Sequence, residues 1–393
     1  MTFLNAYDVI VIGSGTVGLS VALALSQKTA LRIAILDIKK PVYHWSSENY
    51  STRVSAISLA SKKFLQTLSI WKTLAEKRVS PYRKMQVWDG EGDGSIDFDC
   101  EEIAETALGY IIEDDLLRSV LFDKIQQTNI QIIAPITLKD LFDRENHMEC
   151  VSDDGKNFSA KLVIAADGAR SWVRDYRRIL MKTWSYHHIA IVATVKTELP
   201  HQQIAYQCFS AAGPLAFLPL QDPCTSSIVW SQISSKAEKL LMMTDEDFKL
   251  SLANALHHRL GKILSVSPRF SFPLQMRHVK NYVQPRLALI GDAAHTLHPL
   301  AGQGVNLGLA DVDKLVNVIV EAIRKKQDFS SVQVLRRYER FRKAENFTML
   351  AMMDVLKNLF ATEMAVIKQL RNKGLSFVNQ CHILKKFLIN SAN

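Results

Sequence analysis

The sequence lacks the cysteine spacing of a disulfide framework or a zinc site. Its 393 residues contain five cysteines, and no two of them form a Cys-x-x-Cys pair. Small disulfide scaffolds and structural zinc sites both need cysteines at close, regular spacing. We therefore expect free thiols, no metal site, and a protein of the reducing cytoplasm.

Long hydrophobic runs are missing as well. A helix that crosses a bilayer needs about 18–20 consecutive apolar residues, and no stretch of this sequence reaches that length. The most apolar segment, residues 9–25, contains three glycines and is not preceded by Lys or Arg, which argues against a signal peptide. We expect a soluble protein in which any membrane contact is peripheral.

Internal repeats and low-complexity linkers are also absent, so the domain plan has to come from changes in pattern. A hydrophobic fraction of 48% and a charged fraction of 22% are ordinary for a globular protein, and they exclude global disorder. At about 100–200 residues per domain, the chain has room for two or three domains.

The net charge of +9 is concentrated near the C-terminus. From residue 321 onward, Lys and Arg outnumber Asp and Glu by 14 to 6, which accounts for nearly all of the surplus. The rest of the chain is almost neutral, so we expect no nucleic-acid partner. Two alternatives stay open for the basic segment: packing as helix within the protein or an oligomer, and docking on an anionic membrane or an acidic partner.

A glycine-rich motif near the N-terminus predicts a dinucleotide site. Residues 7–12 read as a buried strand, and Gly13, Gly15 and Gly18 follow in the spacing GxGxxG. An expected helix and a second strand come next, and that strand ends at Asp37. The glycines permit a tight turn close to a pyrophosphate, the helix N-terminus favours the anion, and the carboxylate can accept a ribose hydroxyl. The motif does not distinguish FAD from NAD.

Two later strands are expected to end in an acidic turn. Asp167 and Gly168 follow one apolar run, and Gly291 and Asp292 follow another. Ligands of open α/β sheets bind at the carboxyl ends of parallel strands, where such carboxylates would lie. Either turn taken alone is more simply a solvated loop, so the argument depends on finding them together with the glycine-rich motif.

Together these motifs resemble those of the group A flavin-dependent aromatic hydroxylases, which are p-hydroxybenzoate-hydroxylase-like, and the resemblance covers essentially the whole chain. Residues 298–311 are similar to the signature of the ubiquinone-biosynthesis hydroxylases within that group. The resemblance implies that FAD is the bound cofactor, that the Asp-Gly turn serves both FAD and NAD(P)H, and that Pro299 lies beside the flavin ring. It also implies that backbone N–H groups face the pyrimidine edge of the flavin around Gly302, Gly304, Val305 and Asn306.

Further positions agree with the family, with two departures. Arg53 and Arg118 are similar to the family's cofactor-contacting positions. Asp114 stands where the family usually has Asn, and Asp37 stands where FAD proteins more often have Glu, so the shorter side chain favours a water-mediated ribose contact. The middle of the chain, residues 186–230, is most similar to the bacterial 2-octaprenylphenol hydroxylase subgroup.

The reaction follows from the resemblance. NADH or NADPH would reduce FAD, O₂ would add to give a flavin C4a-hydroperoxide, and one oxygen would pass to the ring of a polyprenylated phenol or benzoquinol. The sequence has no Ser/His/Asp or Cys/His constellation and no HExxH motif, so we name no catalytic side chain and expect the flavin to carry the chemistry.

Such chemistry needs an apolar pocket that excludes water. Residues 215–220, Trp230 and residues 272–274 are candidate linings, although a core role for each is equally open. One of His187 and His188 is expected to point inward, either as a polar sheet residue or as a hydrogen-bond partner of a phenol.

The predicted fold is α/β: a Rossmann-like FAD-binding domain, an inserted mixed or antiparallel substrate sheet, and a helical C-terminal tail. The expected boundaries are residues 1–183 and 274–345 for the FAD-binding domain, 184–273 for the substrate domain and 346–393 for the basic helical segment. Helical periodicity predicts one helix over residues 60–76, another over 244–260, and helix to the end of the chain after residue 305.

Two other functions share most of these motifs. A flavin-dependent prenyl reductase of the same superfamily would share the GxGxxG and Gly-Asp motifs but lack the run at residues 299–306. A non-catalytic flavin-binding subunit would keep every binding motif. The expected partners are a polyprenylphenol, O₂ and other ubiquinone-biosynthesis proteins, and a homo-oligomer is left open. We expect a cytoplasmic protein that contacts the inner membrane face peripherally.

Overall fold

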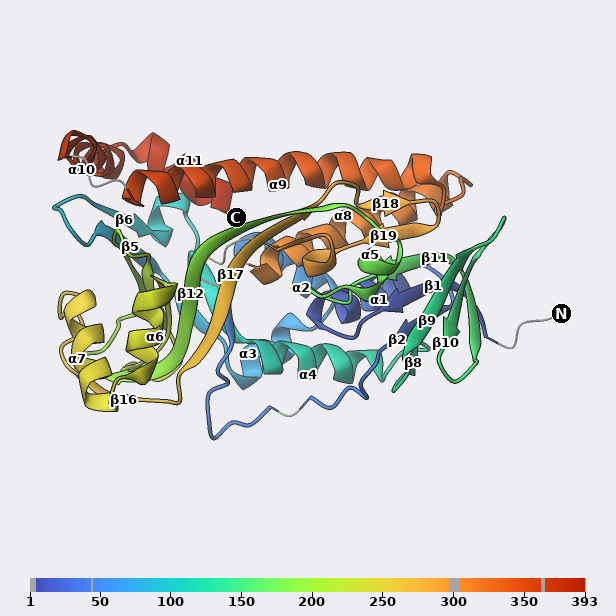
Figure 1. The fold of residues 1–393 in the computed structure, drawn as a ribbon, viewed down its shortest axis with the longest axis horizontal. Helices are drawn as coiled ribbons and strands as arrows, with labels where there is room; N and C mark the ends of the chain where they lie inside the picture. Colours follow the sequence, from blue (N-terminus) through green and yellow to red (C-terminus); the bar gives the residue numbers. More distant parts are fainter. Residues whose placement is uncertain (1–4, 44, 297–303, 362–364, 393) are drawn as a thin grey trace.

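The computed structural model describes residues 5–43, 45–296, 304–361 and 365–392. Figure 1 shows an α/β body at one end of the molecule and a curved sheet with two short helices at the other, with helix α9 lying along both. The expected fold class is confirmed, because a mainly parallel sheet, a mainly antiparallel sheet and a helical C-terminal region are all present.

The first sheet carries the nucleotide-binding motifs. At its centre β1 pairs in parallel with β2 and β11, and β11 pairs in parallel with β19. The carboxyl ends of these strands therefore share one edge, where every predicted acidic turn emerges. The strands of this sheet are β1 (Ala6–Ile12), β2 (Ile33–Leu36), β8 (Gln131–Ile133), β9 (Leu138–Asp143), β10 (Met148–Ser152), β11 (Asn157–Ala165), β18 (Val283–Gln284) and β19 (Leu287–Leu289).

Helices cover this sheet because its strands are apolar on both faces. The predicted strand, glycine turn and helix at the N-terminus are confirmed, and α1 packs between α4 and α8. The helices of this body are α1 (Thr16–Lys28), α4 (Asp114–Ile125), α5 (Trp172–Tyr176) and α8 (Gly304–Arg324), with the short η2 (Gly291–Ala293).

The second sheet is antiparallel except where β13 pairs with β5. Its longest strands, β12 and β17, run side by side from the first body into the second (Figure 1). The strands are β5 (Lys84–Asp89), β6 (Ser95–Asp99), β12 (Met181–Thr197), β13 (Ile204–Phe209), β14 (Leu215–Pro219), β15 (Thr225–Ile233), β16 (Ile263–Val266), β17 (Phe270–Val279) and β20 (His295–Thr296). Strands β5 and β6 join this sheet although the expected boundaries place residues 84–99 in the first domain. The division into domains otherwise stays a prediction.

Two helices, α6 (Ser234–Met242) and α7 (Asp245–Ala255), cover the outer face of the second sheet. The single helix expected over residues 244–260 is wrong at its end, because His257 and His258 adopt φ values of +55° and +53°, which a right-handed helix does not allow. Helix α6 has no counterpart in the sequence-based expectation.

A small third sheet joins the two bodies. It consists of β3 (Val54–Ser58), β7 (Gly109–Glu113) and β4 (Ser80–Tyr82), all antiparallel. The helix expected over residues 60–76 is divided into α2 (Leu59–Thr67) and α3 (Trp71–Lys77), since Ser69 between them has a φ of +58°.

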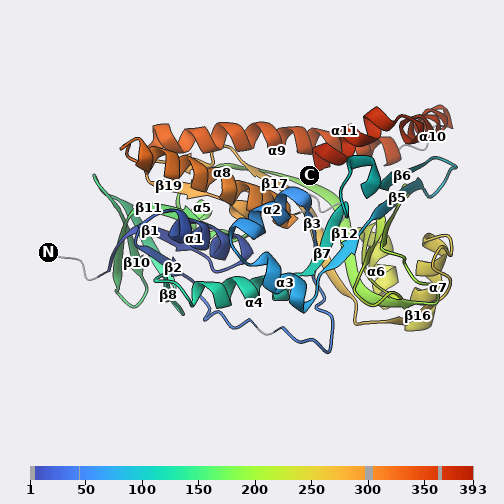
Figure 2. The same cartoon turned by 180° about the vertical axis from the view of Figure 1, so that it is seen from behind.

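The C-terminal region is helical, as expected, apart from a turn at residues 325–331. The helices after it are α9 (Val332–Ala361), α10 (Ala365–Gln380) and α11 (His382–Ala392). Figures 1 and 2 place α10 and α11 over β5 and β6, so the tail packs on its own chain. Within the described ranges, no helix is long and apolar enough to span a membrane.

Candidate functional site

The glycine-rich loop has different requirements at its three glycines. Gly13 has a φ of +103°, and a Cβ there would lie 2.5 Å from the carbonyl oxygen of Ala166. A Cβ at Gly18 would collide with the carbonyl of Gly13, so both positions are fixed by packing of β1, α1 and β11. A Cβ at Gly15 would meet no described atom within 4 Å. Gly15 therefore borders open space, as a backbone that approaches a ligand requires.

A cavity of about 440 Å³ lies beside this loop at the carboxyl edge of the first sheet. Its size is within the range of small-molecule sites. The predicted positions that line it are Gly13, Gly15, Asp37, Asp167 and Gly168.

Asp37 holds the glycine-rich loop in place through hydrogen bonds from Ser14. One carboxylate oxygen accepts hydrogen bonds from the N–H and the hydroxyl of Ser14, both at 2.6 Å, and the other accepts the N–H of Lys39 at 2.9 Å. Because a carboxylate has about four acceptor positions, Asp37 keeps capacity for a hydroxyl in the cavity that it lines.

Asp167 has a buried oxygen that needs a donor. Its Oδ2 accepts the N–H of Val173 at 3.1 Å, whereas its Oδ1 is buried and has no hydrogen-bond partner among the described residues. Burial raises the pKa of this carboxyl, and hydrogen bonds from Ser171 and Val173 offset only part of the rise. An orphaned carboxylate oxygen costs free energy unless a partner is supplied. The residues present therefore fit a hydroxyl-bearing ligand in the cavity.

The Gly-Asp turn lies at the neighbouring strand end. Gly291 adopts a φ of +59°, and its N–H donates to Asp311 Oδ2 at 2.8 Å. The Asp292 side chain is exposed, yet the surrounding protein raises the pKa of its carboxyl, with His295 and Arg53 acting in the opposite sense.

Arg53 reaches from β3 toward both this turn and the second sheet. Its Nε lies 3.6 Å from Asp114 Oδ2, and its guanidinium carbon lies 5.8 Å from the ring centre of Phe272. Ser55 also donates to Asp114, at 2.6 Å. Asp114 stands where the family usually has Asn, and its negative charge orients the Arg53 guanidinium.

Arg118 lies one turn into α4 and is held locally. Its Nη2 donates to Asp115 at 2.6 Å, and its Nε donates to the carbonyl of Asp114 at 3.3 Å. Tyr43, whose ring lies 5.8 Å from the Arg118 guanidinium, donates a hydrogen bond to the carbonyl of Ser14. The structure therefore brings Arg118 to the same loop as Gly13 and Gly15.

The first described residues of α8 contact the core and β3 through their side chains. Val305 packs against the core, and the Asn306 side chain accepts the N–H of Ser58 at 3.1 Å and donates to the carbonyl of Ala56 at 2.8 Å. This side chain fastens α8 to β3. The predicted role of the backbone N–H groups of Gly304, Val305 and Asn306 stays a prediction. Pro299 and Gly302 lie outside the described residues.

A buried charge network behind the Gly-Asp turn was not assigned from the sequence. Asp311 is fully buried, and its carboxylate lies 2.6 Å from His295 Nε2 and accepts Arg342 Nε at 2.6 Å. Burial would raise the pKa of Asp311, but His295 and Arg342 outweigh it and hold the pKa below its ordinary value. Asp311 is the last residue of the signature at residues 298–311, and that position could have identified it as a site residue. The sequence around Arg342 gives no indication that it pairs with Asp311.

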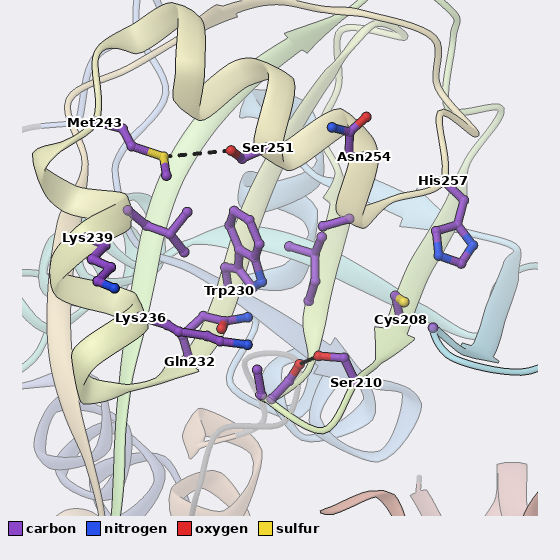
Figure 3. A pocket seen from close by; sticks show the side chains of 16 residues that line it. Cys208, Ser210, Trp230, Gln232, Lys236, Lys239, Met243, Ser251, Asn254 and His257 are labelled. Carbon is purple, nitrogen blue, oxygen red and sulfur yellow. Dashed lines mark hydrogen bonds between the residues drawn. The ribbon is translucent and has the colours of Figure 1, made fainter. Parts of the chain in front are cut away.

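The two faces of the second sheet separate the residues that were candidates for the substrate pocket. Leu215 and Trp230 face α6 and α7, where the Trp230 ring centre lies 5.9 Å from that of Phe248. They line a cavity of about 510 Å³ between the sheet and these helices, together with Lys236 and Lys239 (Figure 3). Trp230 and Leu215 therefore lie on the far side of the sheet from Arg53. Of the two roles left open for them, the structure favours the core role beside α6 and α7.

The inner face of the sheet meets the flavin side. Phe272 is opposite Ala190 in the β17–β12 register, and Ile191, the next residue of β12, belongs to the outer core. Because side chains alternate along a strand, Phe272 points inward, where it is partly exposed below Arg53. Leu218 also faces inward and packs with Ala56 of β3.

Comparisons with known proteins agree with this geometry. The family described as "FAD binding domain" matches residues 6–350. The chain is 34% identical to the 3-demethoxyubiquinol 3-hydroxylase of Escherichia coli (strain K12) over 380 residues, 96% of each chain. It is 32% identical to the mitochondrial ubiquinone biosynthesis monooxygenase COQ6 of Homo sapiens over 437 residues, 99% of this chain and 93% of that one. The structure of p-nitrophenol 4-monooxygenase PnpA from Pseudomonas putida DLL-E4 has a TM-score of 0.79 at 16% identity over 99% of both chains, and supports the fold.

These matches confirm the predicted FAD cofactor and the monooxygenase class. The narrower subgroup, the 2-octaprenylphenol hydroxylases, stays a prediction. The matches extend over nearly the whole length of the chain at identities above 30%. The chain belongs to the FAD-dependent hydroxylases of ubiquinone biosynthesis.

Proposed function

We propose that the protein hydroxylates the aromatic ring of a polyprenylated phenol or benzoquinol, with FAD bound and with NADH or NADPH and O₂ as co-substrates. The observation that carries the proposal is the convergence of Asp37, Asp167 and Asp292 on one sheet edge, with Arg53 between that edge and Phe272. Bound FAD supplies the electron transfer and oxygen activation for which the chain has no side chain of its own.

The glycine-rich loop is proposed to hold the pyrophosphate of FAD. Helix α1 begins after Gly15 with no side-chain cap among the described residues, so its first N–H groups are available to an anion. Asp37 is proposed to hold the adenosine ribose, and Asp292 the ribityl chain. Asp167 is proposed to take a donor from FAD or NAD(P)H through its unpartnered oxygen.

The α8 N-terminus and Arg53 are proposed to stabilise negative charge on the flavin ring. The positive end of the helix dipole lies at Gly304, and Asn306 fixes that end against β3. The Arg53 guanidinium adds a full charge whose direction is set by Asp114. Both groups act by position and charge, and neither transfers a proton.

The inner face of the second sheet is proposed to bind the substrate ring and exclude water. Phe272 offers an aromatic face beneath Arg53, and the neighbouring wall contains Ala216 and Leu218. An apolar wall favours a phenol ring and keeps water from the reacting centre. His187 and His188 stay candidates for the phenol hydroxyl.

We further propose that the protein works at the cytoplasmic membrane face, alongside other ubiquinone-biosynthesis proteins. A polyprenyl tail partitions into lipid because each buried CH₂ contributes about 0.8 kcal/mol. Collecting such a substrate therefore favours an enzyme that visits the bilayer surface.

One experiment distinguishes the hydroxylase from its rivals. The purified protein should show a flavin spectrum, and a short-chain prenylphenol should accelerate NAD(P)H and O₂ consumption and yield a product heavier by one oxygen. A product heavier by two hydrogens would instead indicate a prenyl reductase. A flavin spectrum without any turnover would indicate a non-catalytic subunit.

A further inference from the structure

Helix α10 has its polar and apolar faces reversed relative to an ordinary surface helix. A surface helix normally turns its apolar stripe to the protein and its polar side to water. In α10 the side chains that bond to the rest of the chain are polar, and the most exposed large ones are apolar. The inward-facing polar residues are Lys368, Arg371, Asn372 and Asn379.

The inward face meets an acidic segment of the same chain. Residues 89–105 contain eight Asp and Glu and no Lys or Arg. Lys368 Nζ lies 2.7 Å from Glu91, and Arg371 Nε donates to Asp89 at 2.8 Å with both side chains only 1% exposed. The basic residues that face inward are therefore neutralised internally.

The outward face is apolar. Leu370 and Phe377 are each 64% exposed, and Lys373 lies between them. Residues three and four apart share one side of a helix, so these three lie together, opposite Arg371. Large exposed apolar side chains that gather in this way mark interaction surfaces.

Helix α11 extends this surface. Its inward contacts are Lys385, which lies 2.6 Å from Glu102, and Ile389, which is buried. Ile383 and Leu384 point elsewhere on the helix, and Ile383 is 81% exposed. The two helices, which lie in contact, thus present four large apolar side chains to the outside.

The charge of the two helices themselves has one sign, and Asp93 of the turn between β5 and β6 lines a recess beside Lys373 and Phe377. No Asp or Glu occurs from residue 365 to the end of the chain. Lys373 and Lys386 are exposed, and neither has an ion-pair or hydrogen-bond partner among the described residues. Apolar side chains flanked by free lysines are typical of helices that lie in the interface of anionic bilayers.

We propose that the outward face of α10 and α11 docks on an anionic lipid bilayer, with Leu370, Phe377, Ile383 and Leu384 entering the headgroup boundary and Lys373 and Lys386 at lipid phosphates. The proposal goes beyond ring hydroxylation and identifies which surface meets the membrane. The docking residues differ from Lys368, Arg371 and Lys385, which the protein uses to hold its own tail.

Vesicle co-sedimentation of the full-length, FAD-loaded protein tests the apolar part of the surface. We expect binding to phosphatidylcholine vesicles that contain phosphatidylglycerol. The double variant Leu370→Ser/Phe377→Ser should bind them at least about ten-fold more weakly, because two apolar side chains no longer leave water. The matched control, Met242→Ser/Leu250→Ser, changes two exposed apolar residues on α6 and α7 and should bind like the wild type.

Charge variants test the lipid chemistry. Lys373→Gln and Lys386→Gln should each weaken binding to the anionic vesicles about five-fold and leave binding to pure phosphatidylcholine unchanged. Lys262→Gln, an exposed lysine of the second body, is the control. Thermal melting and flavin content should match the wild type in every variant, since the outward side chains do not hold the tail.

The proposal is overturned if the wild type does not bind anionic vesicles, or if the control variants lose as much vesicle binding as the docking variants. It is also overturned if Leu370→Ser/Phe377→Ser dissolves an oligomer while vesicle binding is absent, because the face then pairs with a second copy. Hydroxylation of a water-soluble short-chain phenol should be unchanged in the docking variants. That assay separates a failure of docking from a failure of the proposed function.

Discussion

Asp311 holds the most deeply buried negative charge behind the Gly-Asp turn, and its neutral isostere should weaken both the fold and the turn. The carboxylate accepts the N–H of Gly291 at 2.8 Å and lies 2.6 Å from both His295 Nε2 and Arg342 Nε. Asp311→Asn keeps the volume of the side chain but removes the charge that compensates Arg342, whose side chain is 3% exposed.

The expected cost follows from the burial of this pair. Removing one partner of a buried ion pair costs about 3–5 kcal/mol. Arg342 retains a second carboxylate, the half-exposed Glu345, so we expect a loss of about 3 kcal/mol. Domains are commonly stable by about 5–15 kcal/mol, so the variant should still fold. At an unfolding entropy of about 2.1 cal/mol/K per residue, its Tm should be lower by about 4 °C.

Urea unfolding and FAD titration measure the two effects. Asp311→Asn should lower the free energy of unfolding by the amount above and weaken FAD binding at least ten-fold, because the Gly291 N–H loses a charged acceptor. Glu345→Gln is the control, and its exposed carboxylate should contribute less than about 1 kcal/mol. Wild-type stability together with wild-type FAD affinity in Asp311→Asn would refute the reasoning.

The same variant has a defined pH signature. His295 and Arg342 hold the pKa of Asp311 below its ordinary value despite burial. A carboxyl with a lowered folded-state pKa stabilises the protein above its unfolded pKa of about 3.9, and this contribution is lost as the pH falls toward the folded value. The stability difference between wild type and Asp311→Asn should therefore shrink below about pH 4.

Three further predictions follow from the site and the tail. Asp292→Ala should be purified without FAD, and full flavin occupancy in its absorption spectrum would remove this residue from the cofactor site. Gly13→Ala should fail to fold stably because its Cβ meets a carbonyl at 2.5 Å, whereas Gly15→Ala, with open space beside it, should melt like the wild type and bind FAD more weakly. Arg371→Gln leaves the Asp89 carboxylate buried without its cation and should cost about 3 kcal/mol in urea unfolding; an unchanged midpoint would show that the pair contributes nothing.

The sequence was most informative where local geometry determines the structure. The spacing of Gly13, Gly15 and Gly18 between an apolar strand and a helix predicted the loop, because only that turn fits between β1 and α1. The acidic turns after β11 and β19 could likewise be predicted as ligand-binding positions, because the carboxyl ends of parallel strands lie at one edge of the sheet.

Contacts between segments that are distant in the chain could not be predicted from the sequence in this way. The sequence left Trp230 open between a pocket and a core role, and only the strand register places it on the outer face of the sheet. Asn306 belongs to a backbone-binding motif, yet its side chain is used to fasten α8 to β3. Breaks such as Ser69 depend on a single left-handed residue inside a good helical period, which a hydrophobic pattern does not record.

The local sequence also did not indicate that β5 and β6 belong to the second sheet. Their sequence follows segments of the first body. The pairing of β5 with β13 depends on residues more than 100 positions later in the chain, and β6 joins the sheet through β5. Pairings of that range are decided by tertiary packing, because the sequence of a strand does not indicate which strand it pairs with.

The ion pair between Arg371 and Asp89 joins helix α10 to strand β5, and the two residues are 282 positions apart in the chain. During synthesis the acidic hairpin emerges long before Arg371, so Asp89 gains its cation only after α10 has been made. A shortened chain that ends after α9 would expose this carboxylate and lose the wall beside Gly92 and Gly94, both of which lie against Asn372. The acidic turn between β5 and β6 is therefore covered only when α10 is in place.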